Sequence, residues 1–221
     1  MPHSENTSAI SVWDNPFLGV WQRQYIQVDD GPKETQQQVL WIQAPQQFVD
    51  VRSWPYREPV IAQTYNQLNH RQQFDASLLG FAGHFCWEQI DTQQYRCRWH
   101  HHITLLPGSF DDASHCTWLT PDTVIETGSY TDIAGITHPF EECWQRLALS
   151  SVKTWQVSER SVGLQCDDWA ALVCDRRTAP DDWQNYGATC WQRVGGKWQH
   201  QFGTSTSITA YPPNPEPPDN E

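Results

Sequence analysis

The chain is short of positive charge, of long apolar runs and of catalytic signatures. Its 221 residues carry 14 Lys and Arg against 26 Asp and Glu, a formal net charge of −12. So acidic a chain repels phosphate backbones and anionic lipid surfaces, which argues against nucleic acid and membranes as partners. The longest apolar runs fall short of a membrane span, and the opening MPHSENTSAI lacks the basic and apolar regions of a secretory signal. We therefore expect a cytoplasmic protein.

Familiar motifs are missing as well. The sequence has no G-x-S-x-G, H-E-x-x-H, P-loop or G-x-G-x-x-G pattern. Its seven cysteines are odd in number and form no C-x-x-C pair, so we expect reduced thiols rather than a disulfide framework or a structural zinc site. What the chain does have is 13 tryptophans. Indole rings favour strands and fill much core volume, which points to a β-rich fold.

Short strand-like runs separated by turn signals begin at Gly19. Turns are indicated at Asp29–Pro32, Asp91–Thr92, Pro121–Asp122 and Gly195–Gly196. Ten to eleven antiparallel strands at this spacing favour a closed barrel, because closure removes exposed edges. We predict an all-β chain with a single antiparallel barrel of about ten strands over 19–210, an irregular segment over 1–18 and a disordered Pro-rich acidic tail over 211–221. The run 140–151 is predicted as a strand, although its apolar spacing also fits a helix.

A series of short motifs carries a family resemblance. Gly19-Val20-Trp21 is followed by LWIQAPQQFVDVR (40–52), GFAG (80–83), CRWH (97–100), IETG (125–128) and EECWQR (141–146). In this order the chain resembles an uncharacterised family of bacterial lipocalin-like proteins of the calycin superfamily. The resemblance implies a calycin-like barrel with Trp21 at its closed end, and it supplies no catalytic residues. Two departures are the triple His at 100–102 and a polar insert over 55–77, where we expect a loop with a short helix near 60–68.

Polar residues recur on faces that also carry aromatic rings. Alternate residues of a strand share a face, so Asp50 lies with Arg52, and Glu142 lies with Trp144 and Arg146. If Trp21 points inward, the same alternation predicts that Arg23 and Tyr25 do too. A lumen of aromatic walls with a few convergent charges is how small-molecule pockets are built. The predicted ligand-binding residues are Arg23, Tyr25, Trp41, Asp50, Arg52, Trp99, Trp144 and Arg146.

These residues suggest a binding protein for a small, partly hydrophobic ligand. The three arginines would hold a carboxylate or phosphate, so an anionic ligand is expected. The alternative is that the charges face solvent around a packed core, since hollow and filled barrels share one strand pattern. A second hypothesis is an isomerase or hydrolase with Glu126 and Glu142 as acid and base. A third is an interaction scaffold that uses the 55–77 insert or the tail to dock a partner.

Histidines raise the question of a cofactor. His100 and His102 share one face of a strand whose other face carries Trp99 and His101. They would bind a metal only with a third ligand, for which His84, His115 and Glu126 are candidates. A solvated face is the commoner situation, so no metal site is predicted. A heme held by His200 lacks a supporting motif, and we predict no cofactor. The oligomeric state stays open.

Overall fold

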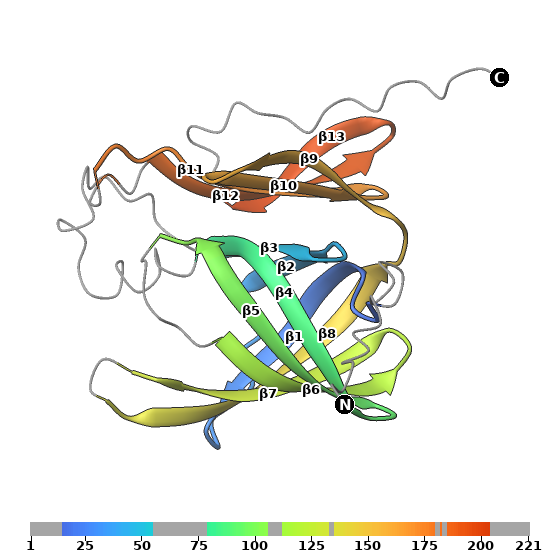
Figure 1. The fold of residues 1–221 in the computed structure, drawn as a ribbon, viewed down its shortest axis with the longest axis vertical. Helices are drawn as coiled ribbons and strands as arrows, with labels where there is room; N and C mark the ends of the chain where they lie inside the picture. The colour runs from blue at the N-terminus through green and yellow to red at the C-terminus, as the bar shows by residue number, and fades with distance from the viewer. Residues whose placement is uncertain are drawn as a thin grey trace, which may run out of the picture.

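The fold is all-β in the residues that the computed structural model describes, which are 15–54, 79–105, 112–132, 135–179, 182 and 185–203. Eight strands close into an antiparallel barrel, and five more form a separate sheet beside it (Figure 1). The expected helix near 60–68, the rest of the 55–77 insert, residues 1–14 and the 211–221 tail lie outside the described residues. No helix in the described part of the chain is long and apolar enough to cross a membrane.

The barrel is built from strands that follow one another in sequence. They are β1 (Gly19–Val28), β2 (Gln38–Gln43), β3 (Gln47–Ser53), β4 (Gly80–Asp91), β5 (Gln94–Ile103), β6 (Asp112–Thr120), β7 (Thr123–Thr131) and β8 (Thr137–Ala148). Each strand pairs with the next, and β8 pairs with β1 from Val20↔Ala148 to Val28↔Phe140. The strand prediction for this stretch is confirmed over the helical alternative, because β8 is hydrogen-bonded to β1 and β7 along both of its edges.

The remaining strands form the second sheet. They are β9 (Val152–Ser158), β10 (Ser161–Cys166), β11 (Trp169–Asp175), β12 (Tyr186–Val194) and β13 (Lys197–Gly203), in the order β13-β12-β11-β10-β9. The prediction of one barrel with about ten strands is therefore wrong. Because β8 already occupies the free edge of β1, the barrel is complete at Ala148 and offers β9 no edge to join. The six-residue β10 was also missed by the sequence analysis.

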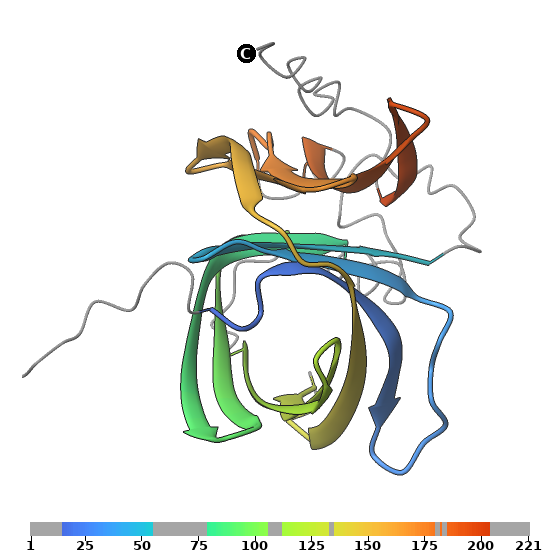
Figure 2. The ribbon, with the colours of Figure 1, turned by 90° about the vertical axis from the view of Figure 1, so that its right-hand side faces the viewer.

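The second sheet packs on the outer face of β2, β3 and β4 (Figure 2). This interface is an aliphatic core whose barrel side includes Leu40, Ile42, Val49, Val51 and Ala82, and whose sheet side includes Val162, Leu164, Ala171, Val173 and Ala188. Polar contacts between described residues also join the two layers. Tyr186 Oη donates a hydrogen bond to the carbonyl of Gly80 at 2.7 Å, and the Arg177 guanidinium donates to the carbonyls of Thr104 and Leu105. Gly80 suits this junction, because a Cβ there would lie 2.4 Å from the Asp50 carbonyl oxygen.

The barrel interior is aromatic. Its core combines Phe17, Trp21, Trp41, Phe48, Phe81, Phe85, Tyr95, Trp99 and Trp144. On β5 the residues Tyr95, Cys97 and Trp99 are buried while Arg96, Arg98 and His100 are exposed, which confirms the predicted alternation of this strand. All seven cysteines of the chain are free thiols.

Trp21 closes one end of the barrel. It is fully buried, and its Nε1 donates a hydrogen bond to the carbonyl of Phe17 at 2.7 Å. The Arg146 guanidinium lies 4.5 Å from the Trp21 ring centre and 5.0 Å from that of Trp118. Arg146 Nη2 also donates to the carbonyl of Pro16 at 2.9 Å. Segment 15–18 and Arg146 therefore act together as the plug of this end.

Candidate ligand site in the barrel

A small cavity lies inside the barrel, away from the Trp21 plug. Its volume is about 30 Å³. Among the described residues, ten side chains line it: Trp41, Phe48, Asp50, Arg52, Phe81, Trp99, Asp112, Glu126, Glu142 and Trp144. This space holds roughly two water-sized groups, whereas pockets for whole drug-sized ligands measure roughly 300–1,000 Å³. The barrel is therefore mostly packed, and the cavity fits one end of a molecule.

Asp50 and Arg52 form an ion pair on the lumen face of β3. Arg52 Nε donates to Asp50 Oδ1 at 2.7 Å and Nη2 donates to Oδ2 at 3.3 Å, while the guanidinium lies 4.8 Å from the Phe81 ring centre. Burial raises the pKa of Asp50, and the Arg52 charge opposes that rise. The Arg52 side chain is 16% exposed, so this pair reaches from the cavity toward solvent.

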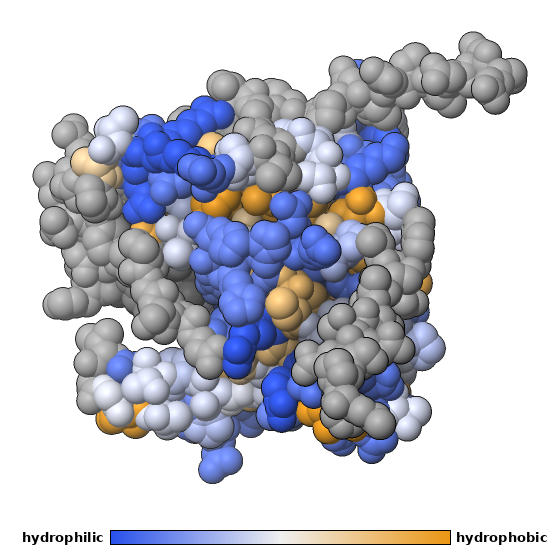
Figure 3. Space-filling model, viewed as in Figure 1, coloured by the Kyte–Doolittle hydropathy of each residue, from blue (hydrophilic) through white to orange (hydrophobic). Residues whose placement is uncertain are grey.

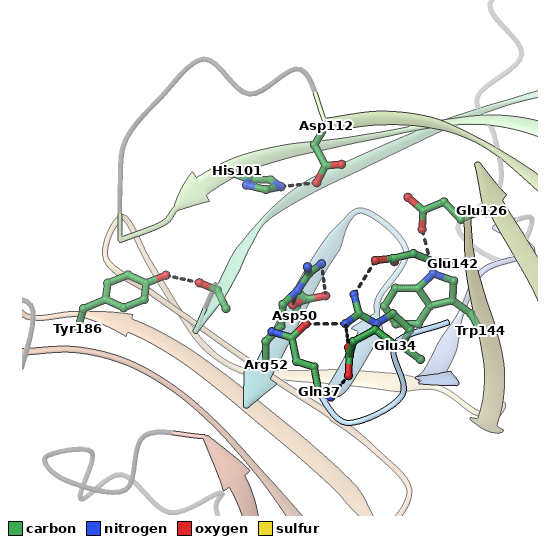
Figure 4. A network of polar contacts seen from close by, with 12 residues as sticks. Glu34, Gln37, Asp50, Arg52, His101, Asp112, Glu126, Glu142, Trp144 and Tyr186 are labelled. Carbon is green, nitrogen blue, oxygen red and sulfur yellow. Dashed lines mark hydrogen bonds and ion pairs between the residues drawn. The ribbon is translucent and has the colours of Figure 1, made fainter. Parts of the chain in front are cut away.

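Arg23 lies behind Glu142 rather than on the cavity wall. Its Nη1 donates to Glu142 Oε1 and its Nη2 donates to Gln37 Oε1, each at 2.5 Å, and Glu34 Oε2 lies 3.9 Å away (Figure 4). The side chain is only 2% exposed. Glu34 and Gln37 come from the connection between β1 and β2, and Glu34 exchanges two backbone hydrogen bonds with Ile26 of β1. Glu142 therefore lines the cavity while its carboxylate is paired with Arg23, which does not line the cavity.

Glu126 faces Glu142 across the β7–β8 pair, where the two residues are register partners. Trp144 Nε1 donates a hydrogen bond to Glu126 Oε2 at 2.9 Å. Burial raises the pKa of Glu126 well above its usual value, and the neighbouring Glu142 and Asp112 carboxylates raise it further. The protonated form of Glu126 is therefore favoured, beside a Glu142 that is paired with an arginine.

A histidine–aspartate pair lies at the mouth of the cavity. His101 Nε2 is 2.6 Å from Asp112 Oδ2, and the His101 ring stacks on Phe81 with ring centres 4.0 Å apart. Both side chains are partly exposed. Strand alternation placed His101 on the apolar face of its strand without indicating a site. Asp112, the first residue of β6, was not predicted as a site residue.

Most of the predicted site residues converge on this cavity. Trp41, Asp50, Arg52, Trp99 and Trp144 line it together with Glu126 and Glu142, and Arg23 supports Glu142. Arg146 does not reach it, because it belongs to the plug at the other end.

Tyr25 points out of the barrel, contrary to the prediction. A β-bulge between Arg23 and Tyr25 reverses the alternation of β1, since the extra residue shifts all later side chains to the opposite face. Tyr25 Oη donates to Glu141 Oε1 at 2.8 Å, and Lys33 Nζ lies 3.6 Å from the ring centre.

The histidine candidates lie outside the lumen. His100 and His102 are exposed on the outer face of β5, and His84 of β4 is the register partner of His100. The His84 and His102 ring centres are 4.6 Å apart, and burial together with the neighbouring histidines lowers the pKa of His102. This face forms part of the hydrophilic middle of the surface in Figure 3. In the part of the chain that the structure describes, no group of three or more His, Cys, Asp or Glu is placed to hold a metal ion.

The structure also shows where the other two candidates for a third metal ligand and the candidate heme ligand lie. Glu126 is inside the barrel, whereas His115 is exposed on β6. His200 lies on β13 of the second sheet, so it does not face the barrel lumen as an axial heme ligand would.

Comparisons with known proteins identify a family and a fold. The protein family described as Protein HRI1 matches residues 19–209. The crystal structure of an uncharacterized protein, YLR301w, from Saccharomyces cerevisiae matches with a TM-score of 0.60 at 14% identity, over 91% of this chain and 90% of that chain. No curated protein matches. These findings show neither a bacterial origin nor membership of a lipocalin family, and at this identity the structural likeness concerns the fold alone.

Proposed function

The chain belongs to the HRI1 family, and from the geometry of its barrel we propose that it is a small-molecule binding protein. The ligand enters at the end marked by Arg52, His101 and Asp112, and one end of it occupies the cavity. An eight-stranded antiparallel barrel plugged by a tryptophan is calycin-like in architecture, and small barrels of this kind hold one ligand in their lumen. The cytoplasmic location stays a prediction.

The observation that carries the proposal is the convergence of buried ionisable groups on one cavity. Arg23, Asp50, Glu126 and Glu142 are all buried inside a barrel whose other interior residues are mainly aromatic. Buried ion pairs are commonly no more stabilising than apolar side chains of the same volume. Groups of this kind with a perturbed pKa cluster at binding and catalytic sites. A binding role explains why this core retains them around an open space.

The geometry also argues against the anionic ligand that the arginines suggested. Arg23 is hydrogen-bonded to Glu142 and Gln37. Nε and Nη2 of Arg52 are both hydrogen-bonded to Asp50. An anion that bound these arginine nitrogens would have to displace a carboxylate from them. The apolar part of the ligand has a clear place, because Trp41, Trp99 and Trp144 supply flat walls.

Native mass spectrometry of the freshly purified protein tests this proposal. We expect a retained mass above that of the denatured chain. We also expect the occupancy to fall at least tenfold in Asp112→Asn, which removes the charge at the mouth, and to stay unchanged in Asp91→Asn, which alters an exposed turn. A chain that carries no adduct and whose tryptophan fluorescence is unaffected by a small-metabolite extract would contradict the proposal.

A second candidate function is an isomerase or hydrolase in the same lumen. It is favoured by Glu126 and Glu142, two facing carboxyls in different surroundings: burial raises the pKa of Glu126, whereas Glu142 is paired with Arg23. Glu126 would donate a proton and Glu142 would accept one. Turnover of the retained compound that is lost in Glu126→Gln while binding persists would establish this function. Unchanged turnover in Glu126→Gln would exclude the role of Glu126. The scaffold hypothesis stays a prediction, because the insert and the tail lie outside the described residues.

A further inference from the structure

Three of the four carboxyl groups around the cavity have a basic partner from the chain itself. Arg52 pairs with Asp50, Arg23 pairs with Glu142, and His101 pairs with Asp112. Among the described residues, Glu126 has no such partner within ion-pair distance, although it is only 6% exposed. Glu126 is therefore the one carboxyl among the described residues at this cavity that has no basic partner.

The surroundings of Glu126 suit a cation that the chain itself does not supply. Glu126 accepts a hydrogen bond from Trp144 Nε1, which both a neutral carboxyl and a carboxylate can accept. Burial and the charges of Glu142 and Asp112 raise the pKa of Glu126, while Ser114 and Arg52 lower it by less. In the free protein these surroundings favour a proton on the carboxyl more than water does.

The surrounding walls also suit a cation. Trp144 lies directly beside Glu126, with the N–H edge of its ring toward the carboxyl, and Trp41 and Trp99 line the same cavity. A cation that comes to lie against an indole face in this cavity gains electrostatic attraction that increases when water is excluded. The cavity of about 30 Å³ limits the size of the cation to roughly that of a water molecule or two. A primary ammonium group meets both conditions, and its N–H groups can donate to the Glu126 oxygens.

We propose that Glu126 is the binding subsite for the primary ammonium end of a small amine ligand, with the tryptophans around the cavity beside it. The inference rests on the proposed function, because it names the charged group of the ligand for the same lumen. The amine enters as R–NH₃⁺, Glu126 becomes a carboxylate, and the proton of its carboxyl group leaves to solvent. The charges that face this site are those of Glu142, Asp112, Asp50, Arg52 and Arg23, all of which keep their present partners.

The test compares three probes of similar size and different charge: n-butylammonium, n-butyrate and n-butanol. Tryptophan fluorescence reports binding, and calorimetry at pH 7 in two buffers with different heats of ionisation reports proton release. We expect n-butylammonium to bind at least tenfold more tightly than the other two probes, with release of up to one proton per chain. The acid and the alcohol match its apolar length, so they control for hydrophobic binding.

A matched pair of variants locates the site. Glu126→Gln keeps the shape and the acceptor for Trp144, and we expect it to weaken n-butylammonium binding at least tenfold and to abolish the proton release. Glu141→Gln is the control, because Glu141 is on β8 next to Glu142 but pairs with Tyr25 outside the barrel. The thermal unfolding curve of each variant shows that it is folded.

The outcomes separate the inference from the function it rests on. Tighter binding of n-butyrate, or an amine that binds equally well to Glu126→Gln, overturns the ammonium subsite and leaves a ligand-binding barrel. A native adduct that contains no amine does the same. If no probe changes the fluorescence and the purified chain carries no adduct, both proposals fail.

Discussion

The two faces of the wall formed by β2, β3 and β4 differ sharply although they come from the same strands. The lumen face presents Trp41, Phe48, Asp50 and Arg52, while the face toward the second sheet presents Leu40, Ile42, Val49 and Val51. Both faces are buried, so burial alone does not explain the charges. The aliphatic side shows that these strands can be packed without ionic groups. The lumen keeps its charges around a cavity, which agrees with a site for a ligand.

Removing Arg23 should produce the largest effect. In Arg23→Met the Glu142 carboxylate is left buried without its cation, and we expect a loss of about 3–5 kcal/mol in the free energy of unfolding. Urea unfolding at pH 7 measures it. Arg96→Met is the control, because the exposed Arg96–Glu88 pair contributes less than about 1 kcal/mol. Recovery of stability in Arg23→Met/Glu142→Leu would show that the lumen charges are dispensable for folding, whereas a double variant as unstable as the single one would contradict this account.

Truncating a side chain on the aliphatic face should lower the free energy of unfolding slightly less than Arg23→Met does. Leu40 is 1% exposed at the barrel–sheet interface, and Leu40→Ala should lower the free energy of unfolding by about 3 kcal/mol through lost contacts and a cavity. Leu119→Ala is the matched control, since Leu119 is 59% exposed and its truncation should change stability by less than about 0.5 kcal/mol. The same unfolding experiment applies. Equal effects at the two positions would mean that the second sheet does not stabilise the barrel.

Glu126→Gln should have the smallest effect, and that effect should depend on pH. The folded state raises the pKa of Glu126 above its usual value of 4.5, so the folded protein holds this proton more tightly than the unfolded chain does. The associated stability is complete below that usual value and is lost as the pH rises through the folded pKa. Relative to wild type, Glu126→Gln should therefore become progressively more stable between pH 5 and pH 8. Thermal unfolding across this range tests it, and parallel curves would mean that Glu126 is already ionised at pH 5.

Strand alternation allowed much of the lumen to be predicted from sequence. Asp50, Trp99 and Trp144 were placed correctly because the side chains of a regular strand change face at every residue. The same rule failed at Tyr25, where a bulge inserts one residue that no turn residue or proline marks. Arg146 was assigned to the correct strand but to the wrong end of the barrel. Its depth along the barrel axis depends on the register with β1, which the local sequence does not encode.

Closure of the barrel after eight strands could likewise not be predicted from local sequence patterns. The runs 140–151 and 153–158 were both predicted as strands, but only the first, in β8, pairs with β1. That choice is made by residues more than a hundred positions apart. The His101–Asp112 pair was missed for a related reason, since its two members meet only when β5 and β6 are aligned.

The order of the strands along the chain has a consequence for biosynthesis. All eight barrel strands precede Ala148, and the sheet that covers Leu40, Ile42 and Val51 ends at Gly203. A ribosome adding roughly 5–20 residues per second needs several seconds to make that last stretch. A barrel that closes during this interval would present an uncovered aliphatic wall, a surface that favours aggregation. Translation speed after codon 148 should therefore influence the yield of folded protein.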